Sequence, residues 1–347
     1  MPATFECVPD LARGKWLRPM EAEAFGSILS VVPRGFEAYV RIFHPVERDR
    51  PHETKSWLDI NAETYFDDFD DIGAALETEL TTWAKTAASF GTTMHAEAQY
   101  ARLVRRDYGG ADGVIAADGW RYCGTSDGSL DVASLAVVAT VLSRHTSTPD
   151  AGIAAIWEGW GGLVSSAGIA RYAVDENNGS PSRPTVEGTA LGINHTLRER
   201  LKASARHWMA GTRSMVEALR GDTVFNPEPG SGLLSRRDAS GPLFELQEGT
   251  GRAYVLFEAG PNDFADATWP GSAPWVDEDL WVQSPNILWP DDHSWLLATE
   301  IDFDSTLVAG STELIQELKG TPGLEVLPIR TEADLSSDGD VINRPAG

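Results

Sequence analysis

The sequence has little of what stabilises secreted proteins or holds proteins in membranes. Its 347 residues include only two cysteines, Cys7 and Cys123, too few for a disulfide framework or a thiolate zinc site. No stretch approaches about 18 uninterrupted apolar residues, the length of a membrane span, and the first residues lack the apolar core of a signal peptide. These features predict a cytoplasmic protein with no membrane partner.

Positive charge is also scarce. The chain has 28 Lys and Arg against 52 Asp and Glu, which gives a formal net charge of -24. Such a chain repels phosphate backbones, because nucleic-acid binding depends on Lys and Arg displacing counterions. The charge therefore predicts no nucleic-acid partner and is consistent either with simple solvation or with a basic protein partner.

Several catalytic motifs are missing as well. The sequence contains no His-Glu-x-x-His zinc helix, no phosphate-binding loop ending in Gly-Lys, and no Gly-x-Gly-x-x-Gly fingerprint after a strand. The sequence leaves enzymatic activity uncertain, favours a protein without it, and predicts no cofactor.

What is present is an alternation of strand and helix patterns. Apolar residues at a period of two predict a strand over 35–46, followed by a charged loop over 47–55. Apolar residues at three- and four-residue steps predict an amphipathic helix over 68–89. Similar patterns predict helices at 130–143, 195–219 and 312–319, a hairpin at 243–258, a hairpin at 286–303, and strands at 153–161 and 324–329.

Strands that arrive as hairpins, with helices between some of them, favour an α+β fold in which an antiparallel or mixed sheet packs with several helices. We expect one large α+β domain over 1–331. The polar, turn-rich segment 175–184 is the candidate for a loop or sub-domain boundary. Residues 332–347 are acidic and poor in apolar side chains, so we expect a flexible tail.

The segment Glu300-Ile-Asp-Phe-Asp-Ser-Thr306 carries the sharpest motif. Its DxDxT core follows an apolar strand and is similar to the nucleophile loop of haloacid-dehalogenase-type phosphatases. The resemblance implies that Asp302 attacks phosphorus and Asp304 shuttles a proton beside a magnesium ion. The other acidic residues and the lysine of that family come from far downstream, whereas only 41 residues follow Thr306 here.

Read as a strand, the same segment places Glu300, Asp302 and Asp304 on one face. These carboxylates are candidate ligands for Mg²⁺ or Ca²⁺ if the face borders a cleft. On a face open to bulk water they are a solvated row, which is the interpretation that the polarity of exposed antiparallel faces favours.

Tryptophan is abundant, with 12 residues, and several lie beside Gly, Pro or Asp. Trp157, Trp160, Trp289 and Trp295 are the candidate residues of a ligand-binding groove, because indole rings near loops can stack on ligands. The same rings can instead fill a core, with the indole N–H at its edge.

Several stretches together resemble a group of uncharacterised proteins common in high-GC Gram-positive bacteria. They are 35–45 (GFEAYVRIFHP), 144–149 (RHTSTP), 157–161 (WEGWG) and 286–311 (NILWPDDHSWLLATEIDFDSTLVAGS). The resemblance implies no activity, cofactor or catalytic residue. A more distant likeness to α+β immunity-type modules rests on acidity and tryptophan content. The leading hypothesis is a non-catalytic binding or interaction protein; the alternative is a metal-dependent hydrolase centred on Asp302–Thr306.

Overall fold

The computed structural model describes the chain in nine stretches: 5–61, 65, 75–106, 113–160, 163, 232, 234–246, 252–276 and 282–344. The chain divides into two compact units, where the sequence predicts one domain. Unit 1 comprises Met1–Glu21, Asp131–Glu187 and Arg200–Ala298, and unit 2 comprises Ala22–Leu130, Gly188–Glu199 and Thr299–Gly347. The predicted boundary at 175–184 and the predicted helix at 195–219 lie outside the described residues.

Unit 1 contains neighbouring strands in the order β10-β9-β6-β8-β7, and their pairings are antiparallel. Their bounds are Leu296–Ala298, Ile287–Pro290, Gly152–Trp157, Arg252–Glu258 and Phe244–Leu246. The predicted strand at 153–161 and the hairpins at 243–258 and 286–303 are therefore confirmed, with shorter strands. β6 lies between two neighbours, which is why its first five residues are apolar or small and buried.

The main described helix of unit 1 is α5, Val132–Leu142, which confirms the predicted helix at 130–143. Asp131 caps it by accepting a hydrogen bond from the Ser134 backbone N–H. The remaining helical segments are short or of the 3₁₀ type: η1 Leu11–Ala22, η4 Ser143–His145, α8 Arg236–Ala239, η6 Pro261–Asp263 and η7 Trp269–Ser272. None of the described helices has both the length and the apolar composition that crossing a membrane requires.

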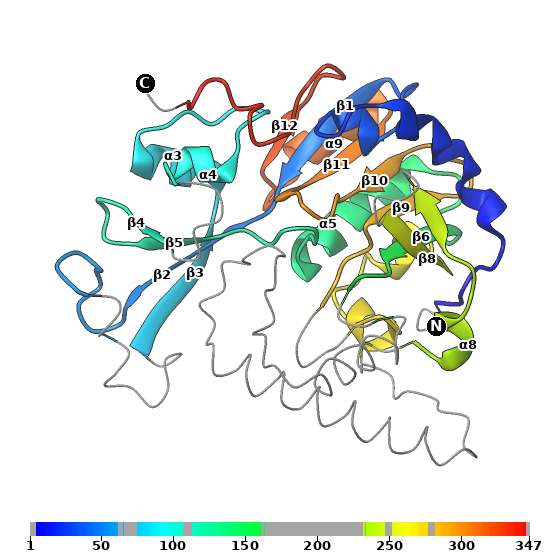
Figure 1. Ribbon diagram of the computed structural model, residues 1–347, viewed down its shortest axis with the longest axis horizontal. Helices are drawn as coiled ribbons and strands as arrows, with labels where there is room; N and C mark the ends of the chain where they lie inside the picture. Colours follow the sequence, from blue (N-terminus) through cyan, green and yellow to red (C-terminus); the bar gives the residue numbers. More distant parts are fainter. Residues whose placement is uncertain are drawn as a thin grey trace, which may run out of the picture. The chain divides into compact units, whose positions relative to one another are not determined.

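Unit 2 contains two groups of antiparallel strands (Figure 1). The first, in the order β12-β1-β11, consists of Val326–Pro328, Ala38–Phe43 and Ser305–Gly310. The second is a four-stranded sheet in the order β3-β2-β5-β4, made of Leu76–Thr81, Val46–Pro51, Arg121–Gly124 and Val114–Ile115. The helical segments are η2 Ile28–Ser30, α3 Trp83–Phe90, α4 Tyr100–Leu103 and α9 Thr312–Gly320.

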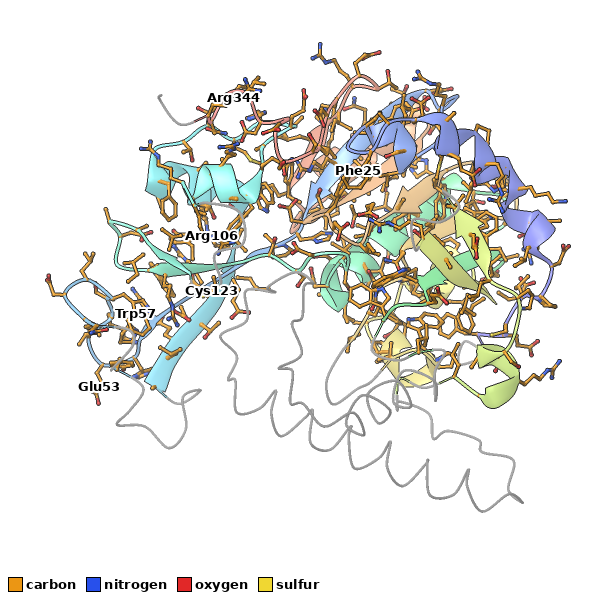
Figure 2. The ribbon with its side chains drawn as sticks, in the orientation of Figure 1. Phe25, Glu53, Trp57, Arg106, Cys123 and Arg344 are labelled. Carbon is orange, nitrogen blue, oxygen red and sulfur yellow. The ribbon has the colours of Figure 1, made fainter. Side chains whose placement is uncertain are left out.

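A shared apolar core joins the four-stranded sheet to α3 and α4. Its buried residues are Phe43, Val46, Trp83, Ala87, Ala98, Tyr100, Leu103, Val104, Ala116, Trp120 and Tyr122. Helices next to antiparallel strands establish the α+β class that the hairpin pattern predicts. Figure 2 adds the side chains to this view.

The predicted helix over 68–89 is wrong in its middle part. Residues 76–81 form β3, which pairs with β2, and the helix begins only at Trp83, where Thr82 caps it. Leu76 and Leu80 have helical spacing, but residues four apart also share one face of a strand, so the spacing fits both structures. Pairing with β2, which is remote in sequence, decides between them.

The charged segment after Pro45 is also not the predicted loop, because 46–51 forms β2. Its charged side chains form ion pairs with residues of the neighbouring strands. Those strands are separate segments of the chain, so the sequence of 46–51 alone does not indicate the pairs. Likewise, the strand predicted to reach 303 ends at Ala298, and the next strand, β11, begins at Ser305.

The end of the described chain, 332–344, differs from the flexible tail that the sequence predicts over 332–347. Four of its residues are buried: Ala333, Leu335, Gly339 and Asp340. Asp340 accepts hydrogen bonds from the backbone N–H groups of Gln99 and Asn343. The tail has few apolar residues, as the sequence indicates, but a buried carboxylate with several donors compensates for the entropy of ordering it.

Candidate functional site

The carboxylates of the DxDxT segment lie in a turn between β10 and β11. The Phe303 N–H donates to the Glu300 carbonyl at 3.0 Å, and the Asp302 N–H donates to the Glu300 carboxylate at 2.7 Å. Asp302 is exposed, whereas Asp304 has only 16% of its side chain exposed. The predicted row of Glu300, Asp302 and Asp304 on one strand face is therefore wrong, because no strand runs through them.

Asp304 is the counter-ion of a buried arginine. Arg41, with 1% of its side chain exposed, donates to Asp304 Oδ1 at 2.9 Å, to Ser305 Oγ at 2.7 Å and to the Ala98 carbonyl at 2.6 Å. Its guanidinium also lies over the rings of Phe43 and Trp83, at 4.6 and 5.2 Å from their centroids. Burial lowers the pKa of Arg41, and the charge of Asp304 opposes that shift. Asp304 therefore stabilises a buried cation.

Thr306, the last residue of the motif, is fully buried beside His44. The His44 Nδ1 lies 2.5 Å from the Ser126 carbonyl, which can only accept, so Nδ1 carries a proton. In the neutral imidazole, Nε2 then accepts from the Thr306 hydroxyl at 2.9 Å. The Thr306 hydroxyl also contacts that of Thr299 at 2.7 Å. This chain of hydrogen bonds fixes the start of β11.

A third aspartate, which the sequence reading missed, belongs to the same part of unit 2. Asp127 is partly buried, and burial together with the negative charges of Asp304 and Asp302 raises its pKa to about 7. The next residue, Gly128, has φ +69° and donates its N–H to the Phe303 carbonyl at 2.8 Å. Its signals in the sequence are the Ser-Asp-Gly turn and the Gly-x-Ser-x-Gly spelling of 124–128.

Metal ligation by these side chains is not supported by their arrangement. Within the described stretches, no group of three or more His, Cys, Asp or Glu side chains is placed to hold a metal ion. The hypothesis that Glu300, Asp302 and Asp304 bind a metal gains no geometric support from this turn.

The four candidate tryptophans do not form one surface. Trp289 and Trp295 are 1% and 0% exposed, and the Trp295 indole N–H donates to a backbone carbonyl at the end of α5 at 3.1 Å. Trp157 and Trp160 are half-buried and meet edge to face, with ring centroids 5.5 Å apart. The Trp160 indole N–H donates to Asn286 Oδ1 at 3.2 Å. Two of the rings are thus core residues, and only the other two lie together.

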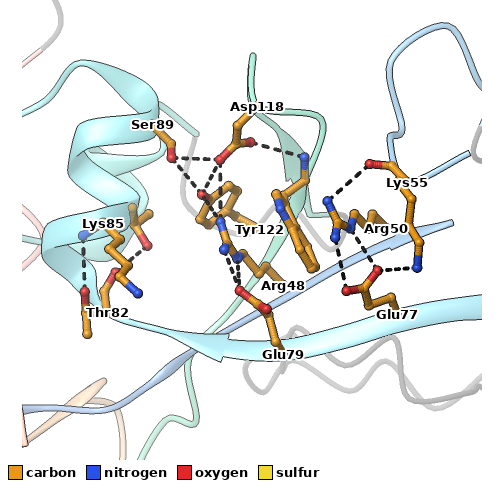
Figure 3. Close-up of polar contacts among 12 residues, drawn as sticks. Arg48, Arg50, Lys55, Glu77, Glu79, Thr82, Lys85, Ser89, Asp118 and Tyr122 are labelled. Carbon is orange, nitrogen blue, oxygen red and sulfur yellow. Dashed lines mark hydrogen bonds and ion pairs between the residues drawn. The ribbon is translucent and has the colours of Figure 1, made fainter. Parts of the chain in front are cut away.

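An ordered arrangement of charged side chains that are partly open to water lies on one face of the four-stranded sheet (Figure 3). Arg48 Nε lies 2.9 Å from Glu79 Oε1, and Arg50 Nε lies 3.1 Å from Glu77 Oε2, so β2 supplies a row of cations and β3 a row of anions. Lys55 adds a second cation beside Glu77 at 2.9 Å. Hydrogen bonds from Arg50 and Lys55 hold the pKa of Glu77 at about 2.

An aromatic side chain supports the cationic row. The guanidinium carbons of Arg48 and Arg50 lie 4.3 and 4.1 Å from the centroid of the Trp120 ring. Arg48 also donates to the Tyr122 hydroxyl at 2.8 Å, and that hydroxyl lies 2.8 Å from Asp118 Oδ2. Because stacking and hydrogen bonds hold both guanidiniums, the rows have a defined geometry.

The opposite face of the sheet contains a shielded ion pair. Arg121 donates to both carboxylate oxygens of Asp49, at 2.9 and 2.7 Å, and the Trp57 indole N–H donates to the same carboxylate at 2.8 Å. Cys123 lies beside it, and burial and the Asp49 charge raise the pKa of its thiol, so the thiol stays protonated. This network belongs to the interior and stabilises the sheet.

The outer edge of β3 presents main-chain hydrogen-bonding groups. The His52 N–H donates to the Ala75 carbonyl at 2.8 Å, and the register pairs Arg50 with Glu77 and Arg48 with Glu79. Antiparallel strands bond their partner at every second residue, so the peptide groups of Leu76, Thr78 and Leu80 point away from β2. The described residues supply no strand on that side. Figure 1 shows β3 beside β2.

Comparison with known proteins adds no family and no relative. No family model matches the chain, no curated protein matches it, and no solved structure matches it.

Proposed function

We propose that the protein is a non-catalytic cytoplasmic binding protein whose partner is a basic protein. The single observation that carries this proposal is the outer strand β3, which combines outward-pointing peptide groups with an acidic row. Such edges pair readily with other chains, and proteins that do not use them usually protect them with charged side chains, above all lysine, or with proline or a bulge. Residues 76–81 (LETELT) contain neither lysine nor proline, and their two charged side chains, Glu77 and Glu79, are paired with Arg50 and Arg48 of β2.

The chemistry at the DxDxT segment adds weight to a function without catalysis. The carboxylate that would shuttle a proton, Asp304, is bound by Arg41, and Asp302 lies in an exposed turn. A metal-dependent hydrolase remains the second candidate function. The observation that favours it is Asp127, whose pKa of about 7 suits a general acid or base near neutral pH.

Affinity capture tests the binding proposal. The full chain, immobilised, is exposed to a lysate of cells that encode it, and retained proteins are eluted with increasing salt. We expect one basic protein at near-equal molar amount, released as salt screens the ion pairs. Recovery of no stoichiometric basic protein at low salt would contradict the proposal.

A hydrolase assay separates the second candidate. Hydrolysis of a generic aryl phosphate is measured with added Mg²⁺ for the parent chain and for Asp302→Asn. We expect no turnover above background. Turnover by the parent that disappears in the variant would give the hydrolase first place, because Asp302 is the residue that the resemblance assigns as nucleophile.

A further inference from the structure

We infer that the outer edge of β3 binds an extended segment of the partner that alternates basic and apolar residues and adds to the sheet as a fifth strand. The inference rests on the proposed function and specifies its partner. It follows from the directions of the main-chain groups and from the different side chains on the two faces of β3.

The main chain supplies sequence-independent binding. Leu76, Thr78 and Leu80 direct their peptide groups away from β2, and a strand placed beside them completes the same ladder. Thr78 and Leu80 are exposed, so no described side chain blocks the approach at that part of the edge. The segment that binds must therefore be extended.

The charged face of β3 requires basic residues on the bound segment. The sheet alternates in sign from strand to strand on this face: Arg48 and Arg50 on β2, then Glu79 and Glu77 on β3. Opposite charges directly across two strands are favourable and like charges are not. The Glu79 side chain is 43% exposed, so a cation on the next strand can reach it. Lysine or arginine at every second position continues the alternation.

The other face of β3 requires apolar or β-branched residues between the basic ones. Leu76, Thr78 and Leu80 point to this face, because successive side chains alternate. Leu80 is 62% exposed, an apolar side chain that a neighbouring strand would cover. The recognised pattern is thus a basic residue followed by an apolar one, repeated along the strand.

A second copy of this chain is the less suitable occupant. Two copies of β3 would bring Glu77 and Glu79 of one chain beside those of the other, and each chain has a formal net charge of -24. Repulsion between the facing glutamates, and between the net charges of the two chains, disfavours self-pairing and favours a cationic partner.

The experiment uses a fluorescent peptide of alternating lysine and valine, blocked at both ends and as long as β3, which has 6 residues. Binding to the full chain is measured by fluorescence anisotropy. We expect the alternating peptide to bind, a glutamate–valine peptide not to bind, and a lysine-only peptide to bind at least about tenfold more weakly. Equal binding of the lysine-only peptide would show simple charge attraction and overturn the inference.

Two substitutions locate the peptide, and the other edge of the same sheet supplies a matched control. Thr78→Pro removes an outward N–H without removing a bond to β2, and Glu79→Lys reverses the charge that the peptide meets. Ile115→Pro on β4 also removes an outward N–H, since the Ala116 N–H bonds the Trp120 carbonyl within the sheet. We expect both β3 variants to weaken binding at least about tenfold and Ile115→Pro to leave it unchanged.

Hydrogen exchange provides a readout that does not depend on substitution. In the parent chain, the peptide should slow exchange of the Thr78 and Leu80 amides and leave that of Ile115 unchanged. Unchanged exchange at Thr78, or Thr78→Pro binding like the parent, overturns the inference. If a basic protein is captured from the lysate equally well by Thr78→Pro, the proposed function stands and only the β3 inference fails.

Discussion

On one face of the four-stranded sheet in unit 2, Arg121 and Asp49 have 7% and 2% of their side chains exposed, whereas on the other face Arg48 and Glu79 have 14% and 43% exposed. The chemical pairing is the same in both places, an arginine held by a carboxylate from a neighbouring segment. The two pairs differ in whether water can solvate one charge after its partner has been removed.

This difference separates structural charge from charge available for binding. A buried pair that loses one partner leaves an ion that water cannot reach, so its two members depend strongly on each other. A partly exposed pair that loses one partner is solvated again at little cost. The outer row on β3 can therefore change its partners, while the Asp49 network and the Arg41–Asp304 pair cannot.

The largest effect should come from the shielded face. Asp49→Ala leaves the Arg121 guanidinium and the Trp57 indole N–H without their acceptor, and we expect the free energy of unfolding to fall by about 3–5 kcal/mol. Urea denaturation measures it. The double variant Asp49→Ala/Arg121→Met should recover much of the loss, because no unpaired cation remains. A loss below about 1 kcal/mol in the single variant would contradict the comparison.

A similar contrast exists within the DxDxT segment. Asp304→Ala should lower the free energy of unfolding by about 3 kcal/mol, because Arg41 is buried and keeps only neutral acceptors. Asp302→Ala, two residues away and exposed, is the matched control and should change it by less than about 0.5 kcal/mol. Equal losses from both variants would mean that the ion pair does not distinguish the two carboxylates.

The end of the chain tests whether a single buried carboxylate can hold a polar segment. Asp340→Ala removes the acceptor for the Gln99 and Asn343 N–H groups and should cost about 1–3 kcal/mol. Asp338→Ala serves as the control, since that side chain is 84% exposed. Proteolysis should also cut 332–344 sooner in Asp340→Ala. Equal melting temperatures for both variants would indicate that the tail is not held by Asp340.

Asp127 gives a smaller, pH-dependent effect. Its pKa of about 7 lies above the ordinary aspartate value, so the folded state binds a proton that the unfolded state releases between about pH 4 and pH 7. Stability that Asp127 contributes at low pH is therefore lost as pH rises toward 7. Asp127→Asn should be more stable than the parent by about 1 kcal/mol at pH 8, allowing for solvent screening, and equal to it near pH 4. The measurement is the urea midpoint of both proteins across this pH range. If the prediction is wrong, the two midpoints will differ by the same amount at every pH.

The smallest effect should come from the outer row. Glu79→Gln should change the free energy of unfolding by less than about 1 kcal/mol, and less still at high salt, because Glu79 is 43% exposed and Arg48 keeps the Tyr122 hydroxyl and the Asp118 carboxylate as partners. The same variant should weaken binding of the lysine–valine peptide. A large stability loss from Glu79→Gln would remove the distinction between the two faces.

Much of the fold could be predicted because its signals are local. The alternation over 35–46, the helical spacings over 130–143 and 312–319 and the hairpin turns all act within a few residues, and the corresponding elements β1, α5 and α9 are present. The hairpins with helices between some of them likewise indicated the α+β class.

The candidate site was less accessible to sequence reading. The letters of the DxDxT segment drew attention to Asp302 and Asp304, but the residue that decides the role of Asp304 is Arg41, 263 positions away. The sequence around Asp127 indicated a turn, whereas its raised pKa depends first on burial and then on the carboxylates of Asp304 and Asp302, which are remote in sequence. The tryptophan count could not tell Trp289, a core residue, from the half-buried Trp157.

By itself, the sequence determined which segments alternate, where several helices lie and how much charge the chain carries, because each follows from covalent neighbours and composition. Only the tertiary structure decided that 76–81 is a strand and that its outer edge faces no other described strand. Residues four apart share a face in both a helix and a strand, so the spacing of Leu76 and Leu80 is ambiguous. Hydrogen bonding to β2 decides that the segment is a strand. The pairing joins residues 46–51 to residues 76–81, and neither segment's own sequence indicates that the other is its partner.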